Sequence, residues 1–359
     1  MRGTLLIIAM QFAFVAPLPG AEVPLDKMGE PFYSKTLQVK WDVATNPLPA
    51  RAAIFKVVSP AFSQHAISNL IQMARFSESN RVPSSELHGR WSAEGNILFR
   101  SPDQSRSLFI SPSEGKVHLY SPDFSATLEG VPTQARAYEL GTNIIAALGL
   151  PTKELQSDQN GHPRAWFYPG TRTHFDKGQR KMITEPSSMG VEFRRVLDGL
   201  PSDQQSLNIQ FEGGERITQL KLRWQGAQVA KQCSVASPDQ IMDWIKEGRA
   251  RVQSRETTGT RWVKVSEIKQ LTIKDIELCY SAGTSIDKDG DERPADYLYP
   301  YAVLEAEAQI SADDAESFCL FSPVIAEGLS KPSHDAGEFG VFPSALNEKH
   351  AKERQPGEQ

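Results

Sequence analysis

Three aspartates around a glycine form the pattern in this sequence that resembles a metal site. Asp287, Asp289 and Asp291 alternate along the chain, and Gly290 lies between the last two. Alternating carboxylates beside a glycine can converge on a hard cation such as calcium. The match to a complete EF-hand loop fails, because Gly290 comes too early and the twelfth position is Leu298 rather than glutamate. The pattern therefore predicts either a structural calcium that stiffens this loop or a solvated hairpin tip without metal.

Catalytic motifs are missing from the sequence. It contains no His-Glu-x-x-His zinc motif, no Gly-x-Ser-x-Gly elbow, no P-loop and no dinucleotide fingerprint. A histidine and an acid two positions apart, His174 and Asp176, indicate an ordinary solvated loop. A triad assembled from distant residues leaves no trace in sequence order. We therefore predict no catalytic residues and favour a protein that is not an enzyme.

The three cysteines, Cys233, Cys279 and Cys319, all lie in the C-terminal half. In an oxidising compartment, one disulfide among them with one remaining thiol is a natural arrangement. Buried apolar thiols on strands are the alternative, because free cysteine is often part of a core. No two of the three lie close enough in sequence for a zinc motif.

Aromatic residues concentrate in the second half and suggest a partner-binding surface. Tyr297, Tyr299, Tyr301 and Trp262 are the candidates, because aromatic side chains with polar tips are enriched at protein interfaces. In a strand, Tyr299 and Tyr301 would share a face. The alternative is ordinary core packing against a neighbouring helix.

The elements that position these residues follow an N-terminal segment typical of export. Arg2 precedes an apolar run from Thr4 to Ala16, and small and helix-breaking residues follow up to Ala21. This layout predicts a secretory signal peptide over residues 1–21. A retained anchor is the alternative, but the run is shorter than the roughly 20 residues that a spanning helix needs. We expect a secreted or periplasmic protein without a transmembrane segment in its mature chain.

Charge and composition exclude other classes of partner. The net charge is −5, and Lys and Arg show no excess that would attract nucleic acid. The same balance disfavours general attraction to anionic membranes. Hydrophobic residues make up 39% of the chain, which is enough for a sizeable core. No cofactor is indicated apart from the calcium considered above.

Periodicity and turn signals divide the chain into two α+β domains, each a small antiparallel sheet packed by one or two helices. We predict a lead-in segment over 22–52, an N-terminal α+β domain over 53–150, a connection over 151–190, a C-terminal α+β domain over 191–329 and a disordered tail over 330–359. Within the connection, a strand-like island spans 165–168.

Three helices and one hairpin carry the clearest local signals. Helices are predicted after the cap Ser63, from Thr133 to Leu148 ahead of Gly149 and Pro151, and after Ser237 with its proline and glutamine. The sequence Glu-Gly-Gly-Glu at 212–215 predicts a hairpin, because glycine permits positive φ.

The second domain resembles a known group of bacterial extracytoplasmic domains. The string VEFRRVLDGLP at 191–201, the hairpin glycines, LKLRW at 220–224, the helix over 239–249 and YLYPY at 297–301 together resemble the YycH/YycI and PepSY-like domains. The likeness covers about 190–310, with a weaker echo in 53–150. It implies an antiparallel sheet packed by a helix, and a role in binding or restraining other proteins.

These observations favour an exported, non-catalytic module that binds a protein or peptide outside the cytoplasm. An open sheet edge would accept a peptide strand. The alternatives are a structural component of the cell envelope and an exported hydrolase whose site forms only in the fold.

Overall fold

Strands dominate the chain. The computed structural model describes residues 29–44, 48–59, 61–88, 93–122, 129–176, 178, 180–252, 261–281, 284–286, 292–311, 314–330, 332–334 and 338–341. Across these ranges it contains three α-helices, α1 (Gln64–Met73), α2 (Gln134–Leu148) and α3 (Pro238–Lys246). None of the helices in these ranges is long and apolar enough to cross a membrane.

One mixed sheet of 13 strands runs through the molecule. Ten strands follow one another as hydrogen-bonded neighbours: β1 (Glu30–Phe32), β12 (Ala250–Val252), β19 (Asp314–Pro323), β18 (Pro300–Ser311), β14 (Gln270–Tyr280), β9 (Leu200–Glu212), β10 (Arg216–Arg223), β6 (Lys116–Tyr120), β5 (Ser107–Ser111) and β4 (Ile97–Arg100). Strand β2 (Gln38–Trp41) pairs with β14, while β8 (Lys181–Leu197) pairs with both β9 and β7 (Ala165–Asp176). The pairings of β14 with β2 and with β9 are parallel.

Three smaller sheets complete the described strands. Strand β3 (Arg51–Val58) pairs with β11 (Gly226–Ser234) on one side and β17 (Tyr297–Leu298) on the other. Two further pairs are β13 (Arg261–Lys264) with β20 (Glu338–Val341) and β15 (Thr284–Ile286) with β16 (Glu292–Pro294). Strand β20 lies inside the segment 330–359, for which the sequence predicted a disordered tail.

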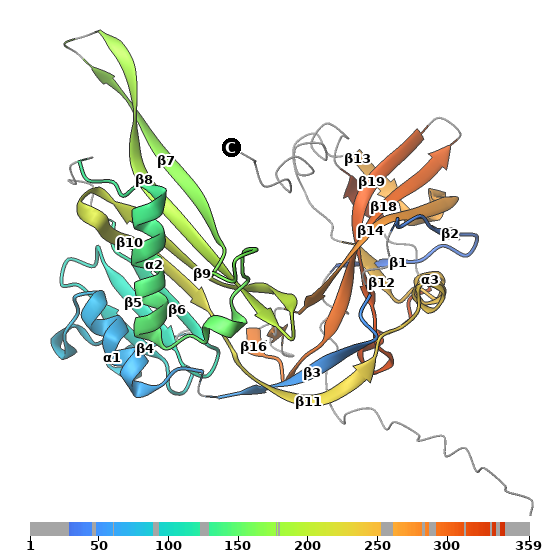
Figure 1. Ribbon diagram of the computed structural model, residues 1–359, viewed down its shortest axis with the longest axis horizontal. Helices are drawn as coiled ribbons and strands as arrows, with labels where there is room; N and C mark the ends of the chain where they lie inside the picture. The colour runs from blue at the N-terminus through green and yellow to red at the C-terminus, as the bar shows by residue number, and fades with distance from the viewer. Residues whose placement is uncertain are drawn as a thin grey trace, which may run out of the picture.

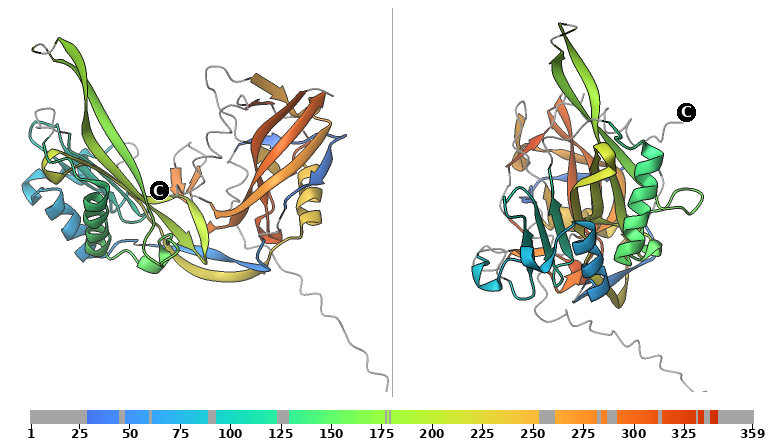
Figure 2. Two further views of the ribbon diagram at one scale, coloured as in Figure 1. Left: turned by 45° about the horizontal axis from the view of Figure 1, so that its top comes forward. Right: turned by 90° about the vertical axis from the view of Figure 1, so that its left-hand side faces the viewer.

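The molecule has two halves, one with α1 and α2 on its outer side and the other with α3 (Figures 1 and 2). In the α1–α2 half, the two helices and strands β4, β5, β6, β8, β9 and β10 enclose one hydrophobic core. In the α3 half, a second core lies between α3 and strands β12, β14, β18 and β19. Strands β3 and β11 run side by side from one half to the other (Figure 1).

The prediction of two α+β domains, each with its own small antiparallel sheet, is wrong. Strands β9 and β10 and the second part of β8 come from the region assigned to the second domain, yet they share a sheet with β4, β5 and β6. Val191 and Phe193 of β8 belong to the same core as Ile144 of α2. The predicted connection over 151–190 contains β7 and the first part of β8. Pairing between strands that are distant in sequence depends on tertiary packing, which local periodicity does not reveal.

The local predictions for helices and the hairpin are confirmed. Ser63, Thr133 and Ser237 each accept a backbone hydrogen bond as the helix cap, and Ser237 with Gln240 forms a complete capping box. Gly149 ends α2 with a φ of 65°. The turn over 213–215 joins β9 to β10, where Gly214 has a φ of 68°. Each of these features depends on residues within a few positions, which is why the sequence contains them.

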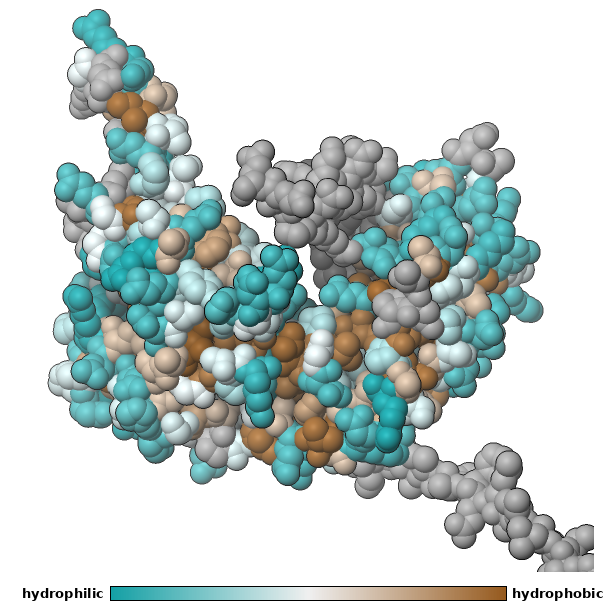
Figure 3. Space-filling model, in the orientation of Figure 1, coloured by the Kyte–Doolittle hydropathy of each residue, from teal (hydrophilic) through white to brown (hydrophobic). Residues whose placement is uncertain are grey.

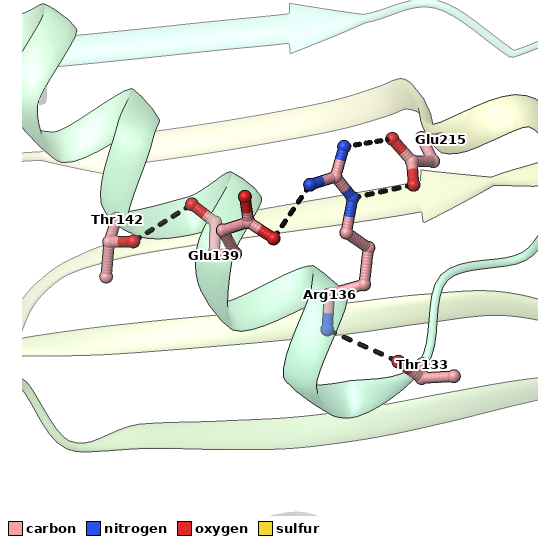
Figure 4. Close-up of polar contacts among 5 residues, drawn as sticks. All are labelled: Thr133, Arg136, Glu139, Thr142 and Glu215. Atoms are coloured by element: carbon pink, nitrogen blue, oxygen red, sulfur yellow. Dashed lines mark hydrogen bonds and ion pairs between the residues drawn. The ribbon is translucent and has the colours of Figure 1, made fainter.

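An ion pair ties α2 to the turn between β9 and β10 (Figure 4). The guanidinium of Arg136 donates from Nε and Nη2 to the two carboxylate oxygens of Glu215, at 2.7 and 2.9 Å. Its Nη1 donates to Glu139 at 2.7 Å. The hydrogen bond from Arg136 holds the pKa of Glu215 below its usual value. Because the pair is exposed, it orients the helix more than it stabilises the fold.

A buried arginine links the end of the α1–α2 half to the start of β11. Arg195 on β8 is 2% exposed and donates from Nε and Nη2 to Glu154, at 2.9 and 2.6 Å. Its Nη1 donates to the side-chain oxygen of Gln205 and the backbone oxygen of Gln225, both at 2.5 Å. The guanidinium also lies 4.9 Å from the centre of the Trp224 ring. A buried cation needs such partners, because its desolvation is costly without them.

Replacing Arg195 with methionine is expected to lower the free energy of unfolding by about 3 kcal/mol, because Glu154 and Gln205 lose their partner inside the protein. Urea denaturation measures the change. The neighbouring Arg194, whose side chain is 47% exposed, provides the control, and Arg194→Met should cost less than about 1 kcal/mol. Equal costs for the two variants would show that the Arg195 network does not support the fold.

Candidate functional site

The sheet face opposite α1 and α2 carries polar and aromatic side chains. Because side chains alternate along a strand, residues next to core positions point to this second face. One row crosses seven strands through directly paired positions: Leu98, Phe109, His118, Lys221, Asn208, Glu192 and Trp166. Such a mixed face differs from a core face and is suited to contact with a ligand or partner.

At the β7 end of this row, an aromatic and charged group forms what we call the Trp166 site: Arg164, Trp166, Tyr168, Glu192 and Arg194. The guanidinium carbons of Arg164 and Arg194 lie 5.0 and 4.4 Å from the centre of the Trp166 ring. The Tyr168 hydroxyl donates to Glu192 at 2.6 Å, and Arg194 donates to the same oxygen at 3.3 Å. Burial and the nearby Glu192 raise the pKa of Tyr168.

The contacts hold the Trp166 site in one arrangement while leaving part of it exposed. Tyr168 is 47% exposed although its hydroxyl is hydrogen-bonded. Cations over an indole ring are attracted to its face, so both arginines help to fix Trp166. Tryptophan, tyrosine and arginine are the residues that most often dominate binding energy at protein interfaces. The site therefore has the composition of a protein-binding surface.

Strand β7 is an edge strand. It pairs with β8, and no other strand among the described residues pairs with its second edge. The pairing contains a bulge between Gly170 and Thr171, which separates a stretch next to the sheet body, Ala165–Tyr168, from the rest of the strand. An edge strand presents backbone donors and acceptors to which another chain can add a strand. The Trp166 site thus lies beside a free backbone edge.

A pocket lies at the β4 end of the same face. Its volume is about 330 Å³, and it is lined by Leu98, Arg100, Gln104, Ser107, Phe109 and His118. The lining combines a serine with a histidine but includes no carboxylate, so it lacks the acid of a Ser-His-acid triad. Arginine, glutamine and an aromatic ring suit it better to binding than to nucleophilic catalysis.

The four residues of the predicted aromatic site do not come together in the structure. Tyr299 and Tyr301 are buried, at 4% and 3% exposure, and belong to different apolar clusters. Tyr297 is half-buried on β17, with its ring centre 6.3 Å from that of Tyr299. Trp262 is 44% exposed on β13, which comes before β14 in the chain. The three tyrosines come after β14 in the chain. Core packing therefore accounts for Tyr299 and Tyr301.

The remaining predicted residues lie apart from the Trp166 site. Cys233 and Cys279 are buried free thiols on β11 and β14, and Cys319 is exposed on β19. Burial raises the pKa of Cys233 to about 11, which makes its thiol unreactive at neutral pH. His174 and Asp176 lie on β7.

The calcium prediction stays a prediction. Asp287, Asp289 and Asp291 lie outside the described residues, between β15 and β16, which pair with each other. Elsewhere, within the described ranges, no three His, Cys, Asp or Glu side chains gather closely enough to hold a metal ion.

Sequence reasoning missed the Trp166 site because it treated residues 151–190 as a connection. One signal was present: Trp166 and Tyr168 are two positions apart in the strand-like island, and this spacing places both on one face of a strand. Arg194 and Glu192 lie on β8, more than 20 residues further along the chain. Only the register of β7 with β8 brings them to Trp166.

Asp203 at the junction of the two halves accepts a hydrogen bond from Tyr301, and burial raises the pKa of its carboxyl. A raised pKa means that ionised Asp203 costs stability at neutral pH, and that this cost disappears as the pH falls through the folded-state pKa. Asp203→Asn should therefore stabilise the protein at pH 7, by on the order of 1 kcal/mol, and the gain should vanish in acid. Urea unfolding between pH 3.5 and 7.5 measures it, with the exposed Asp198→Asn as control. A gain that does not change with pH would contradict this assignment.

Comparisons with known proteins leave the family open. No protein-family model matches the chain, and no curated protein matches it. Among solved structures, it is similar to an uncharacterized protein from Eubacterium rectale ATCC 33656, with a TM-score of 0.41 and 11% sequence identity over 80% of this chain and 87% of that one. The resemblance to YycH/YycI and PepSY-like domains therefore stays a prediction.

Proposed function

We propose that this chain is an exported, non-catalytic binding module that takes up an extended peptide segment of another protein along strand β7. The observation that supports the proposal most directly is the position of Trp166, Tyr168 and two arginines beside a strand edge with which no other described strand pairs. Backbone hydrogen bonds to the edge would provide affinity, and the neighbouring side chains would provide selectivity.

The stretch Ala165–Tyr168 is the part of the edge best suited to this role. It is fixed to the sheet body, because β8 pairs with β9 from Met189 onward, opposite this part of β7. A rigid edge loses little conformational freedom when a peptide binds, so more of the interaction energy remains as affinity. Beyond it, Pro169 lacks a backbone N–H, which limits how far an added strand can continue.

The side chains of the Trp166 site favour a peptide with alternating character. Residues of an added strand alternate between the two sheet faces, so every second side chain would lie beside Trp166 and Tyr168. Arg164 and Arg194 favour a carboxylate at one of these positions, since arginine binds carboxylates through two parallel hydrogen bonds. The Trp166 site is therefore suited to an extended segment in which acidic residues alternate with aromatic or aliphatic ones.

The test is selection of linear peptides from a random library against the purified chain. Trp166→Ala should weaken a selected peptide by about 30-fold or more, which is the loss typical of a hot-spot tryptophan. Trp262→Ala, which alters an exposed tryptophan on another sheet, should change the dissociation constant less than about twofold. Tyr168→Ser and Tyr120→Ser form a second matched pair, because both tyrosines are 47% exposed.

Binding by strand addition also requires that the backbone N–H groups on one edge of the peptide are free to form hydrogen bonds. Methylation of alternate backbone nitrogens on its paired edge should abolish binding, whereas methylation of the intervening nitrogens should be tolerated. Equal loss in the Trp166 and Trp262 variants, or insensitivity to backbone methylation, would rule out this binding mode.

A further inference from the structure

Beyond the sheet body, β7 and β8 continue as a two-stranded arm. Because β8 pairs with β9 only from Met189 onward, residues Gly170–Asp176 and Lys181–Ser188 pair only with each other among the described strands. Eight residues of strand extend about 26 Å. The arm stands clear of the body in all views (Figures 1 and 2). It adds no core of its own, so its length is not explained by stability.

The end of the arm carries the two most exposed large hydrophobic side chains among those described. Phe175 is 55% exposed and Met182 is 61% exposed. They are directly paired across the two strands, so they lie side by side on one face of the arm. Thr173 and Thr184 are the next pair on that face and are joined by a hydrogen bond of 2.9 Å. Figure 3 shows hydrophobic residues near the end of the arm and hydrophilic ones at its tip.

The charge of the arm is opposite in sign to that of the whole chain. The segment 169–188 holds four Lys or Arg and two Asp or Glu residues, whereas the chain has 39 and 44 of them. Arg172, Arg180 and Lys181 of this segment are exposed. Arg172 is paired with Glu185 and Lys181 with Asp176 on the face opposite Phe175 and Met182, so the net positive charge of the arm comes from its turn, which includes the exposed Arg180. An apolar pair at the end of a cationic arm complements an anionic bilayer, where apolar side chains enter the interface and cations remain among the headgroups.

We propose that the arm docks this protein onto the surface of an anionic phospholipid bilayer, with Phe175 and Met182 entering the interface. A protein partner fits the tip less well, because a stable interface buries about 800 Å² on each side and the arm is a narrow ribbon that presents one apolar pair. Membrane contact requires no such area, since the bilayer surrounds the inserted side chains. This docking is independent of peptide binding at Ala165–Tyr168, which lies at the opposite end of β7.

The experiment is flotation of the purified chain with phosphatidylcholine vesicles that contain or lack 40% phosphatidylglycerol. We expect binding to the anionic vesicles at low salt, and loss of most of it at 0.5 M salt, where charges are screened over about 4 Å. The double variant Phe175→Ser with Met182→Ser should reduce the partition coefficient at least tenfold. Arg180→Gln with Lys181→Gln should reduce it by about 25-fold, since each cation near the surface contributes about fivefold.

Two control variants separate arm-specific docking from general effects. Val229→Ser with Trp262→Ser removes exposed apolar side chains elsewhere, and Lys56→Gln with Lys221→Gln removes exposed cations elsewhere. Both should leave the partition coefficient within twofold. Failure of the intact chain to float with anionic vesicles, or equal loss in arm and control variants, overturns the proposal.

A second readout covers the case in which an arm variant fails to fold. Phe175→Trp keeps an aromatic ring at the tip. When anionic vesicles are present, the fluorescence emission of the introduced tryptophan should shift to the blue and be quenched by brominated lipids. An unchanged emission from this variant would equally overturn the proposal. Peptide binding measured on the same preparations reports separately on the Trp166 site.

Discussion

The small number of helices limits how much of the sheet surface this protein can bury. Across the described residues, three α-helices accompany a sheet of 13 strands, so each half can cover one face and leaves the other to polar and aromatic residues. Apolar side chains point to the helices at alternate positions, and the intervening positions carry residues such as His118, Lys221 and Glu192. The uncovered face and its free edge follow from this limit, because no further element is present among the described ones to pack against them.

The two halves meet through few but specific contacts. In the large sheet they are joined by a single parallel pair, Tyr280 with Ser202, and the ribbon of β3 and β11 provides the second connection. A small apolar cluster that includes Phe55, Leu197 and Tyr280 fills the junction. Ser202 and Ser281, next to these contacts, are also buried.

The edge and arm of β7 show how one strand can serve two purposes. Its first residues are held by the sheet and carry the aromatic and cationic Trp166 site, while its last residues leave the sheet and carry Phe175. The bulge after Gly170 separates the two stretches. A bulge increases local twist, so it can direct the arm independently of the fixed edge. Binding a peptide and contacting a bilayer would therefore use different parts of the strand without competing.

The sequence alone determined the features that depend on neighbouring residues. The caps of α1, α2 and α3, the end of α2 at Gly149 and the turn at Gly214 all follow from side chains a few positions apart, and the structure confirms them. The tertiary structure decided which strands pair. It placed β8 with α2 instead of in a second domain, buried Tyr299 and Tyr301, and brought Arg194 of β8 to Trp166 of β7. Register and strand order depend on contacts between segments far apart in the chain, and periodicity records only whether a residue faces inward, not which partner it meets.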